Sequence, residues 1–496
     1  MENKNVLLVN PPDSLLELYN DNENIIFLDY SFWYFYSDRK REKVLIEEFV
    51  KFDDVIMDFN VFKVIGLLRD NIPLWSRWTD RGDQFEQYFR QALFDIFKIY
   101  YGLKKFNIVS VVFPTSISHH LDTLIIEIAC RMSNAKQIFP YNIYSSEYNS
   151  QYGRLLPFVQ KNGVSDRIVI EGNVSDYKYD NDLKDILNYA RNRIKDSKIF
   201  NRKSTSYYLA TFWIIFLWFK LNFKRGLKKI LVPINKNKSH FGIFPSYSII
   251  THLKQMTQQK NAIIYYKMRQ VSKRELKKHK DNISLLIAAH YQPEATSFPE
   301  GGTMYNHIDI VFELRSKGFT GNIFYKEHPG SFLYSEENFG PTRVGQYRSI
   351  EYYQQLEKLG CILIDSHFEL SLEKDQNHWY LPVTITGSIA LERGQAGFHT
   401  IITGYPWYKG LPGTINLSDI NSLASINSSW VTENKEISKK AYSFLRNLLN
   451  NKTVFNGLGI GTGAKINDED LQKVFNTEFD HLIKHLITNN NNNIIS

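Results

Sequence analysis

The stretch from Ser284 to Pro329 begins with SLLIAAH, residues 284–290, and ends with GNIFYKEHP, residues 321–329. Between these two apolar runs, the residues from Tyr305 to Lys317 have helical periodicity. A short continuous apolar run is typical of a strand buried on both faces, as in a parallel sheet covered by helices. The stretch therefore predicts a strand–helix–strand unit of an α/β fold.

The same pattern continues along the chain. Apolar runs recur as CILIDS, VTITGS and HTIITG after residue 360, and as NVLLVN, NIIFLDY and NIVSVVFP before residue 115. Alternation of such runs with amphipathic stretches predicts two α/β domains in series. We expect a first domain over 1–185, a basic segment over 186–240, a second domain over 241–465, a C-terminal helix over 466–488 and a disordered tail over 489–496.

The composition is that of a globular protein. The chain has 496 residues, of which 43% are hydrophobic and 23% charged, with a formal net charge of +8. It has two cysteines, Cys130 and Cys361, both in apolar surroundings, which predicts buried thiols in a reducing compartment. The N-terminal apolar run is too short for a signal peptide, so we expect a cytoplasmic protein.

The positive charge is concentrated in residues 186–240, which hold thirteen Lys or Arg and one acid, Asp196. Within this segment, Tyr207–Phe223 reads YYLATFWIIFLWFKLNF and contains eight aromatic residues. An aromatic apolar helix between cations predicts shallow insertion into an anionic membrane surface. The alternatives are a buried core helix and a membrane span, for which the run is marginal in length. Nucleic acid binding fits the tight apolar block less well.

The membrane hypothesis assigns these side chains to two depths. Aromatic rings would lie among the headgroups, and cations would contact lipid phosphates. The residues that we expect to do so are Trp213, Phe216, Trp218, Lys220, Lys224 and Arg225.

Polar side chains follow several predicted strands of the second half. In Lys326-Glu327-His328-Pro329, a His and a Lys stand at a strand's carboxyl end, where ligands bind in doubly wound sheets. Such a pair suits a phosphate group, because His donates a hydrogen bond and Lys adds positive charge. We expect Glu327 to be a ligand-binding residue as well. The alternative is an ordinary strand end with a capping His.

A second candidate is the turn Thr386-Gly387-Ser388, which leads from a strand into a helix. Free backbone N–H groups and a hydroxyl at a helix N-terminus form an anion site, although a plain Ser N-cap explains the pattern as well. Glu392, which is not at the capping-box position if Ser388 is the N-cap, is free to face ribose hydroxyls or solvent.

The third candidate follows the strand SLLIAA and comprises His290, Gln292 and Glu294. Polar residues thus follow the carboxyl ends of three strands of one domain, which we call strand exits. This arrangement predicts a nucleotide site.

The first half offers candidates for a general base. His119, His120 and Asp122 stand where a helix begins after the strand NIVSVVFP, and Asp122 also suits an ordinary first-turn acid. No metal-site pattern is convincing, since Asp180-Asn181-Asp182 lies in a polar run. Asn456–Gly463 is glycine-rich, and we expect it to be a flexible loop.

Three elements of the second half resemble the capsule polysaccharide biosynthesis proteins related to bacterial Kdo transferases. They are the His-Pro element at Lys326–Pro329, the Ser element at Thr386–Glu392, and GYPWYKGLPGT at Gly404–Thr414, in matching order and spacing. The resemblance covers Ile283–Leu417 and extends only loosely into the first half. It implies a GT-B glycosyltransferase with two Rossmann-like domains, the activated sugar in the second and the acceptor facing the first.

The resemblance also implies that His328 and Ser388 bind the phosphate of a CMP-activated sugar. The chain departs from the family pattern at Trp407 and at Leu411-Pro412, which leaves the donor open among Kdo, a nonulosonate such as pseudaminic or legionaminic acid, and a UDP-sugar. We expect no cofactor or metal, and a glycan acceptor on a lipid carrier at the inner face of the cell membrane. The rival hypotheses are a nucleotide-sugar epimerase of the same fold and a non-catalytic component of capsule assembly.

Overall fold

The structure is a computed structural model of the whole chain. It describes residues 5–11, 13–29, 44–45, 59–70, 85–113, 121–145, 152–161, 164–167, 207–209, 211–212, 215–216, 249–272, 276, 283–292, 301, 304–332, 347–368, 380–424, 426–449, 455–458 and 469–488.

The chain divides into two compact units. Unit 1 comprises Met1–Tyr179, His240–Pro245 and Asn447–Ser496, and unit 2 comprises Asp180–Ser239 and Ser246–Arg446. The boundary differs from the expected one at 465, because the chain returns to unit 1 after residue 446.

Unit 1 is built on a mixed sheet in the order β14-β6-β5-β4-β1-β2-β3, with β7 paired to β6. Strands β3, β2, β1, β4 and β5 pair in parallel, while β6, β7 and β14 pair antiparallel. The three apolar runs expected as strands in the first half are β1, β2 and β4. The strands are β1 (Asn5–Val9), β2 (Ile25–Asp29), β3 (Val44–Leu45), β4 (Ile108–Val112), β5 (Lys136–Ser145), β6 (Tyr152–Lys161), β7 (Val164–Arg167) and β14 (Phe455–Leu458).

Strand β14 corrects the expected flexible loop at Asn456–Leu458, while Gly459–Gly463 lie outside the described residues. Phe455–Leu458 extends the sheet of unit 1 by pairing antiparallel with Tyr152–Leu155. Backbone hydrogen bonds along a sheet edge order a glycine-containing segment that has no distinctive side-chain pattern of its own.

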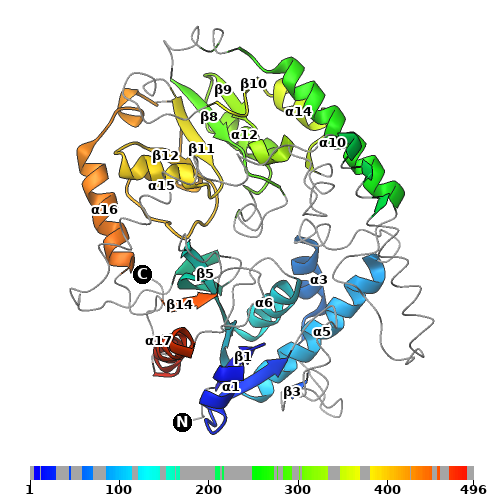
Figure 1. The fold of residues 1–496 in the computed structure, drawn as a ribbon, viewed down its shortest axis with the longest axis vertical. Coiled ribbons are helices and arrows are strands. Elements are labelled where there is room, and N and C mark those ends of the chain that lie inside the picture. Colours follow the sequence, from blue (N-terminus) through cyan, green and yellow to red (C-terminus); the bar gives the residue numbers. More distant parts are fainter. Residues whose placement is uncertain are drawn as a thin grey trace. The chain divides into compact units, whose positions relative to one another are not determined.

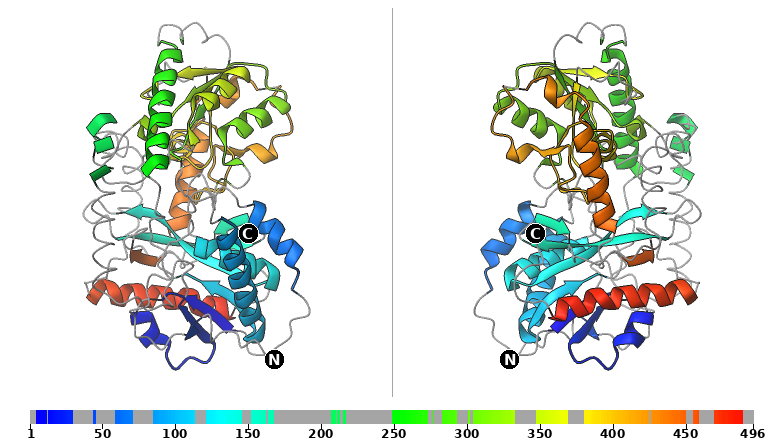
Figure 2. Two further views of the ribbon diagram at one scale, coloured as in Figure 1. Left: turned by 90° about the vertical axis from the view of Figure 1, so that its right-hand side faces the viewer. Right: turned by 90° about the vertical axis from the view of Figure 1, so that its left-hand side faces the viewer.

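The described helices of unit 1 are α1 (Asp13–Tyr19), α3 (Val61–Asp70), α5 (Phe85–Lys105), α6 (Leu121–Ser133) and α17 (Glu469–Thr488). The last of these, red in Figures 1 and 2, packs on the first strands. Its residues Phe479, Leu482 and Ile483 share a buried apolar cluster with Val6 and Leu8 of β1. The Tyr19 hydroxyl also donates to Asp480 Oδ1 over 3.0 Å. Burial of this face therefore fixes the C-terminal helix to unit 1.

Unit 2 has a sheet whose described strands are all parallel, in the order β10-β9-β8-β11-β12-β13. Numbered from the first strand of the unit, this is the order 3-2-1-4-5-6 of a doubly wound nucleotide-binding fold. The strands are β8 (Ser284–Ala288), β9 (Ile323–Lys326), β10 (Cys361–Ile364), β11 (Tyr380–Thr384), β12 (Thr400–Ile402) and β13 (Thr414–Asn416).

Helices on both faces bury the apolar strands, as the sequence predicts. On one face, Tyr266, Val311 and Leu356, from three helices, pack against Leu285 of β8 and Ile323 of β9. The described helices of unit 2 are α10 (Ile249–Arg269), α12 (His307–Ser316), α14 (Ile350–Lys358), α15 (Ser388–Gln395) and α16 (Lys435–Leu449), with 3₁₀ turns at Pro329–Phe332, Leu417–Asp419 and Ser428–Trp430.

A part of the basic aromatic segment is described. Residues 207–209, 211–212 and 215–216 are helical. The Tyr207 hydroxyl lies 3.1 Å from Thr257 Oγ1 of α10, and Lys260 Nζ lies 4.5 Å from the centre of the Tyr207 ring. The first turn of the segment therefore rests on α10.

Other side chains of this helical stretch face outward: Tyr208 is 75% exposed and Phe212 62% exposed, and Leu209 and Phe216 are exposed as well. Among the described residues, no helix is long and apolar enough to cross a membrane. The expected membrane contacts Trp213, Trp218, Lys220, Lys224 and Arg225 lie outside the described residues.

Candidate functional site at the switch point of unit 2

The strand order of unit 2 reverses between β8 and β11, which are hydrogen-bonded neighbours. In such a sheet, ligands bind beyond the carboxyl ends of the strands at this switch point. The described candidates follow β8 (His290), the adjacent β9 (Lys326 and His328) and β11 (Gly387 and Ser388). The topology thus brings together three exits that are up to 98 positions apart in the sequence.

His290 joins two of these exits. Its ring Nε2 lies 3.2 Å from the donating backbone N–H of Thr386 and 3.1 Å from Thr384 Oγ1. Since Nε2 accepts, the neutral ring carries its proton on Nδ1. Burial lowers the pKa of His290 to about 3, with help from the positive charges of His328 and Arg348. The ring is therefore neutral throughout the physiological range.

The turn from β11 into α15 is closed by Gly387. This residue, and not Ser388 as the sequence suggested, is the N-cap, and no side chain caps the helix. A Cβ on Gly387 would lie 2.5 Å from Thr384 Oγ1, so only glycine fits. On the other side, the Tyr408 hydroxyl donates to the Gly387 carbonyl over 2.5 Å.

Ser388 is therefore the first residue of α15. Its hydroxyl makes no hydrogen bond within the described part of the chain. The first N–H groups of a helix lack intrahelical acceptors and lie at the positive end of its dipole. In the described part of the chain, the N–H groups of Ser388 and Ile389 have no acceptor, whereas that of Ala390 donates to the Gly387 carbonyl over 3.1 Å. The start of α15 thus combines backbone donors with a hydroxyl.

His328 is held in one tautomer. Its Nδ1 accepts a hydrogen bond from the backbone N–H of Gly330 over 3.0 Å. The neutral ring therefore carries its proton on Nε2. A Cβ on Gly330 would lie 2.9 Å from His328 Nδ1, so this glycine lets the imidazole approach the main chain.

Lys326, at the end of β9, is partly buried. Burial lowers the pKa of its amine to about 8, against the opposing influence of the carboxylates of Asp365 and Glu392. The amine has no hydrogen-bond or ion-pair partner among the residues that the structure describes. Glu392 is itself buried and influences Lys326 from α15, so the two predicted ligands belong to one neighbourhood.

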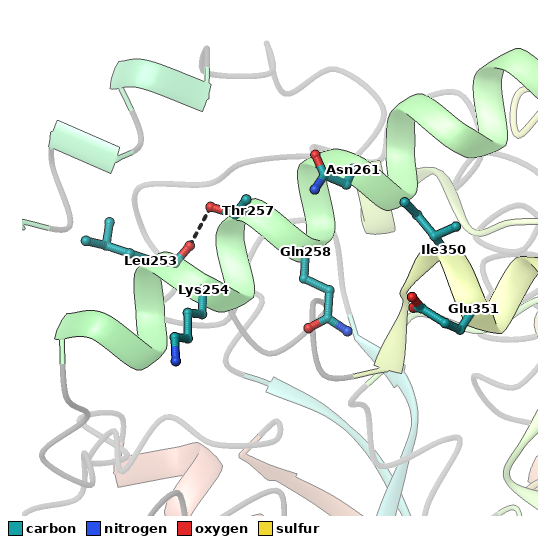
Figure 3. Close-up of a pocket in the computed structure, with 7 residues that line it drawn as sticks. All are labelled: Leu253, Lys254, Thr257, Gln258, Asn261, Ile350 and Glu351. Atoms are coloured by element: carbon teal, nitrogen blue, oxygen red, sulfur yellow. Dashed lines mark hydrogen bonds between the residues drawn. The ribbon is translucent and has the colours of Figure 1, made fainter.

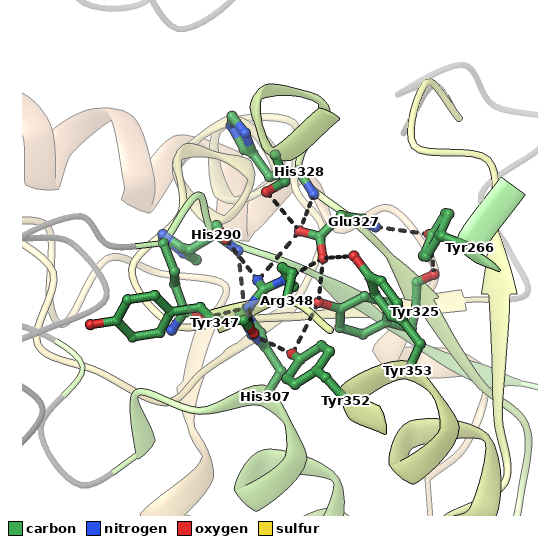
Figure 4. A network of polar contacts seen from close by, with 12 residues as sticks. Tyr266, His290, His307, Tyr325, Glu327, His328, Tyr347, Arg348, Tyr352 and Tyr353 are labelled. Carbon is green, nitrogen blue, oxygen red and sulfur yellow. Dashed lines mark hydrogen bonds and ion pairs between the residues drawn. The ribbon is translucent and has the colours of Figure 1, made fainter. Parts of the chain in front are cut away.

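Glu327 lies in a buried polar network centred on Arg348 (Figure 4). The buried Gln292 belongs to the same network. Arg348 Nε lies 2.5 Å from Glu327 Oε2, and its Nη1 lies 2.6 Å from Gln292 Oε1. Although burial alone would raise the pKa of the Glu327 carboxyl, the charge of Arg348 holds it below its ordinary value. Both residues therefore bond to protein groups.

No sequence pattern identifies Arg348 as part of this site. It lies 21 positions from Glu327 and 56 from Gln292, in a stretch without strand or helix periodicity. The inward direction of Glu327, by contrast, could be predicted. With Ile323 and Tyr325 it continues the two-residue alternation of β9 on the face that packs into the core.

The remaining predicted residues lie outside the described part of unit 2. His119, His120 and Glu294 lie outside the described residues. Asp122 lies in the first turn of α6 in unit 1, and its side chain is not described.

A hollow of about 620 Å³ opens elsewhere in unit 2, between α10 and the start of α14 (Figure 3). Leu253, Lys254 and Gln258 from α10 and Glu351 from α14 are among its lining residues. None of the candidate ligands at the switch point lines it. Chemistry and topology, not the size of the hollow, therefore decide the candidate site.

No cluster of His, Cys, Asp or Glu within the described ranges could hold a metal ion. Both cysteines are buried and free, as expected. Comparisons with protein-family models, curated proteins and solved structures found no match. What the site supports therefore rests on its own chemistry: a cation, a histidine N–H donor and a helix N-terminus suit a small anionic group.

Proposed function

We propose that the protein is a GT-B glycosyltransferase of bacterial surface polysaccharide synthesis, which transfers a Kdo-like or sialic-acid-like sugar from a CMP donor. One observation carries the proposal. The 3-2-1-4-5-6 sheet of unit 2 places Lys326, His328 and the start of α15 at adjacent exits around its switch point.

The phosphate of the donor would bind to groups of complementary charge. His328 donates from Nε2, Ser388 offers its hydroxyl and helical N–H groups, and Lys326 supplies positive charge. Glu392, next to Lys326, is the candidate for the ribose hydroxyls. These groups stabilise the negative charge that grows on the phosphate as the glycosidic C–O bond breaks.

The acceptor hydroxyl forms the new C–O bond and must lose its proton to a base. Asp122, His119 and His120 of unit 1 are the candidates for this role. The electron pair of the broken bond leaves with CMP, so that transfer needs no redox cofactor. Charge stabilisation by His328, Lys326 and α15 makes a metal ion unnecessary in this scheme.

Peripheral membrane association would bring the enzyme to a lipid-linked acceptor. Tyr208, Leu209, Phe212 and Phe216 expose large apolar side chains next to a sequence rich in Lys and Arg. Aromatic side chains at headgroup depth with cations on lipid phosphates are typical of interfacial helices.

A thermal-shift experiment tests the donor. The protein is heated with CMP, UDP or GDP, and we expect CMP to raise the melting temperature most, because a ligand that binds only the folded state stabilises it. His328→Ala and Ser388→Ala should reduce this shift, and His367→Ala, on an exposed residue, serves as the control. If none of the three nucleotides raises the melting temperature, the proposed function is wrong.

A further inference from the structure

We infer that the buried pair Glu327–Arg348 is a positioning device that orients His328 and fixes it relative to the exit of β8. The role of His328 as a phosphate ligand rests on the proposed function, whereas its orientation by the pair does not. The sequence predicts Glu327 as a ligand-binding residue, whereas its contacts assign it to the support of His328.

The carboxylate of Glu327 is saturated by protein donors. Its Oε2 accepts from Arg348 Nε, from the Tyr325 hydroxyl over 3.0 Å and from the Tyr353 hydroxyl over 2.9 Å. Its Oε1 accepts from the backbone N–H of His328, from Ser331 Oγ and, over 3.3 Å, from Arg348 Nη2. Since the side chain is 0% exposed, no lone pair remains for a ligand.

These contacts shape the turn that carries His328. Glu327 Oε1 accepts from the N–H of His328 over 2.8 Å and from Ser331 Oγ over 3.2 Å, so one oxygen holds both ends of the turn. Within the turn, the N–H of Gly330 meets His328 Nδ1. As Figure 4 shows, the imidazole points away from the carboxylate. Glu327 therefore orients the ring through the main chain.

Arg348 connects this turn to the residues that follow the neighbouring strand, β8. Besides its bonds to Glu327, it donates from Nη1 to Gln292 Oε1 over 2.6 Å and from Nη2 to the carbonyl of His290 over 3.3 Å. Its guanidinium also lies 4.7 Å from the centre of the Tyr352 ring. One cation thus connects the exits of β8 and β9, and the spacing between His290 and His328 depends on it.

A chain of hydrogen-bonded side chains connects His307 with Glu327 and sets the direction of the hydrogen bonds along it. His307 Nε2 accepts from the backbone N–H of His290 over 3.2 Å, so its Nδ1 carries the proton and faces the Tyr352 hydroxyl. Tyr352 in turn lies 3.2 Å from the Tyr325 hydroxyl, which donates to Glu327. Burial lowers the pKa of His307, which keeps the ring neutral and this arrangement intact.

Two measurements on the full chain test the inference. The first follows the imidazole nitrogens of His328 by ¹⁵N NMR, with the signal assigned through His328→Gln. The second compares the dissociation constants of CMP and cytidine, whose ratio isolates the contribution of the phosphate. The variants are Arg348→Met, Arg348→Lys and the milder Ser331→Ala. Arg269→Met, in an exposed pair with Glu357, is the control.

In the wild type and in Arg269→Met we expect a single tautomer with the proton on Nε2. In Arg348→Met and Ser331→Ala we expect a tautomer mixture and a fall of about tenfold in CMP affinity, with cytidine affinity within about twofold, since hydrogen bonds to charged groups have this strength. Compared with Arg348→Met, Arg348→Lys should recover part of the single tautomer and part of the CMP affinity. It keeps the positive charge but loses the planar guanidinium that donates several hydrogen bonds at once.

The outcomes separate the inference from the proposed function. If Arg348→Met does not fold, Ser331→Ala decides. Folded variants that keep the wild-type tautomer and the wild-type CMP-to-cytidine ratio overturn the inference. A protein that binds no nucleotide, but whose His328 signal changes in the variants, overturns the proposed function and leaves the positioning role supported.

Discussion

The imidazole Nε2 of His290 lies 3.2 Å from the backbone nitrogen of Thr386, 96 positions further along the chain, and accepts its hydrogen bond. This bond crosses the switch point of the unit 2 sheet, because His290 follows β8 and Thr386 follows β11. It binds a side chain of one exit to the main chain that begins α15. The start of α15 is therefore set by packing from β8 as well as by its own turn.

Substitution of Gly387 by alanine should disturb this junction. The added Cβ would lie 2.5 Å from Thr384 Oγ1 and 3.3 Å from His290 Nε2. We expect the free energy of unfolding to fall by about 1–3 kcal/mol, as for other overpacked sites, and CMP stabilisation to fall with it. Urea denaturation measures the first effect and thermal shift the second.

Gly66 of α3 provides the control, because a Cβ there would have no atom within 4 Å. Gly66→Ala in a helix interior should raise the free energy of unfolding by about 0.5–1 kcal/mol. Adding Thr384→Ala to Gly387→Ala removes the clashing oxygen and should recover part of the loss. A Gly387→Ala protein as stable as the wild type would contradict the geometry described for this turn.

Acid should destabilise the protein through His290. Its pKa is about 3 in the folded protein and 6.5 ordinarily, so below pH 6.5 the unfolded chain binds a proton that the folded chain rejects. The stabilisation is complete above pH 6.5 and is lost as the pH falls towards 3. The loss between pH 7 and pH 5 is about 2 kcal/mol by linkage.

Urea denaturation at several pH values measures this slope. His290→Gln keeps an acceptor for Thr386 but does not titrate, so its unfolding free energy should depend less on pH. His367→Gln, at an exposed position, should leave the slope as it is. Equal slopes for His290→Gln and the wild type would show that His290 is not buried as described.

The sequence predicts the parts of this site that depend on strand position. Continuous apolar runs mark β8, β9 and β11, and the residues that follow them must reach the carboxyl edge of a parallel sheet. The direction of each side chain is a separate matter. Lys326 and Glu327 are neighbours, yet alternation turns Glu327 towards the core together with Tyr325.

Long-range pairing is what the sequence does not contain. No sequence pattern around Arg348 identifies Glu327 as its partner. Likewise, the apolar face of α17 does not indicate which sheet it packs against. Both are decided by contacts that exist only after the chain has folded. The return of the C-terminal residues to unit 1 depends on contacts of the same kind.

Lys326 should make CMP binding depend on pH in the alkaline range. Its pKa of about 8 means that the amine loses its charge as the pH rises through 8. An anionic ligand binds the charged form better, so CMP affinity should be constant below pH 8 and fall above it. Isothermal titration calorimetry from pH 6.5 to 9.5 measures the dependence.

Lys326→Met should bind CMP weakly and with little change over this pH range. Lys254→Met, at a lysine in the hollow between α10 and α14, is a matched control that should retain the wild-type profile. A pH profile of Lys326→Met that equals the wild type would exclude Lys326 as a phosphate ligand.

Membrane binding should depend on the outward aromatic side chains of residues 207–216. Phe212→Ser and Phe216→Ser each remove apolar area that would enter the headgroup region, and we expect the double variant to lose most of its binding to vesicles of phosphatidylserine and phosphatidylcholine. Cosedimentation at low and high salt measures it. Salt should weaken wild-type binding, because the flanking cations contribute through screened attraction.

Phe62→Ser tests whether any exposed phenylalanine has this effect, since Phe62 is 88% exposed on α3 of unit 1. It should bind vesicles as the wild type does. Deletion of Tyr207–Phe223 should abolish vesicle binding and leave CMP affinity unchanged, because the contacts described for Tyr207 are with Thr257 and Lys260 of α10. Sedimentation of the deletion variant with anionic vesicles would refute the assignment of this segment to the membrane, and loss of CMP binding would show that it also supports the nucleotide site.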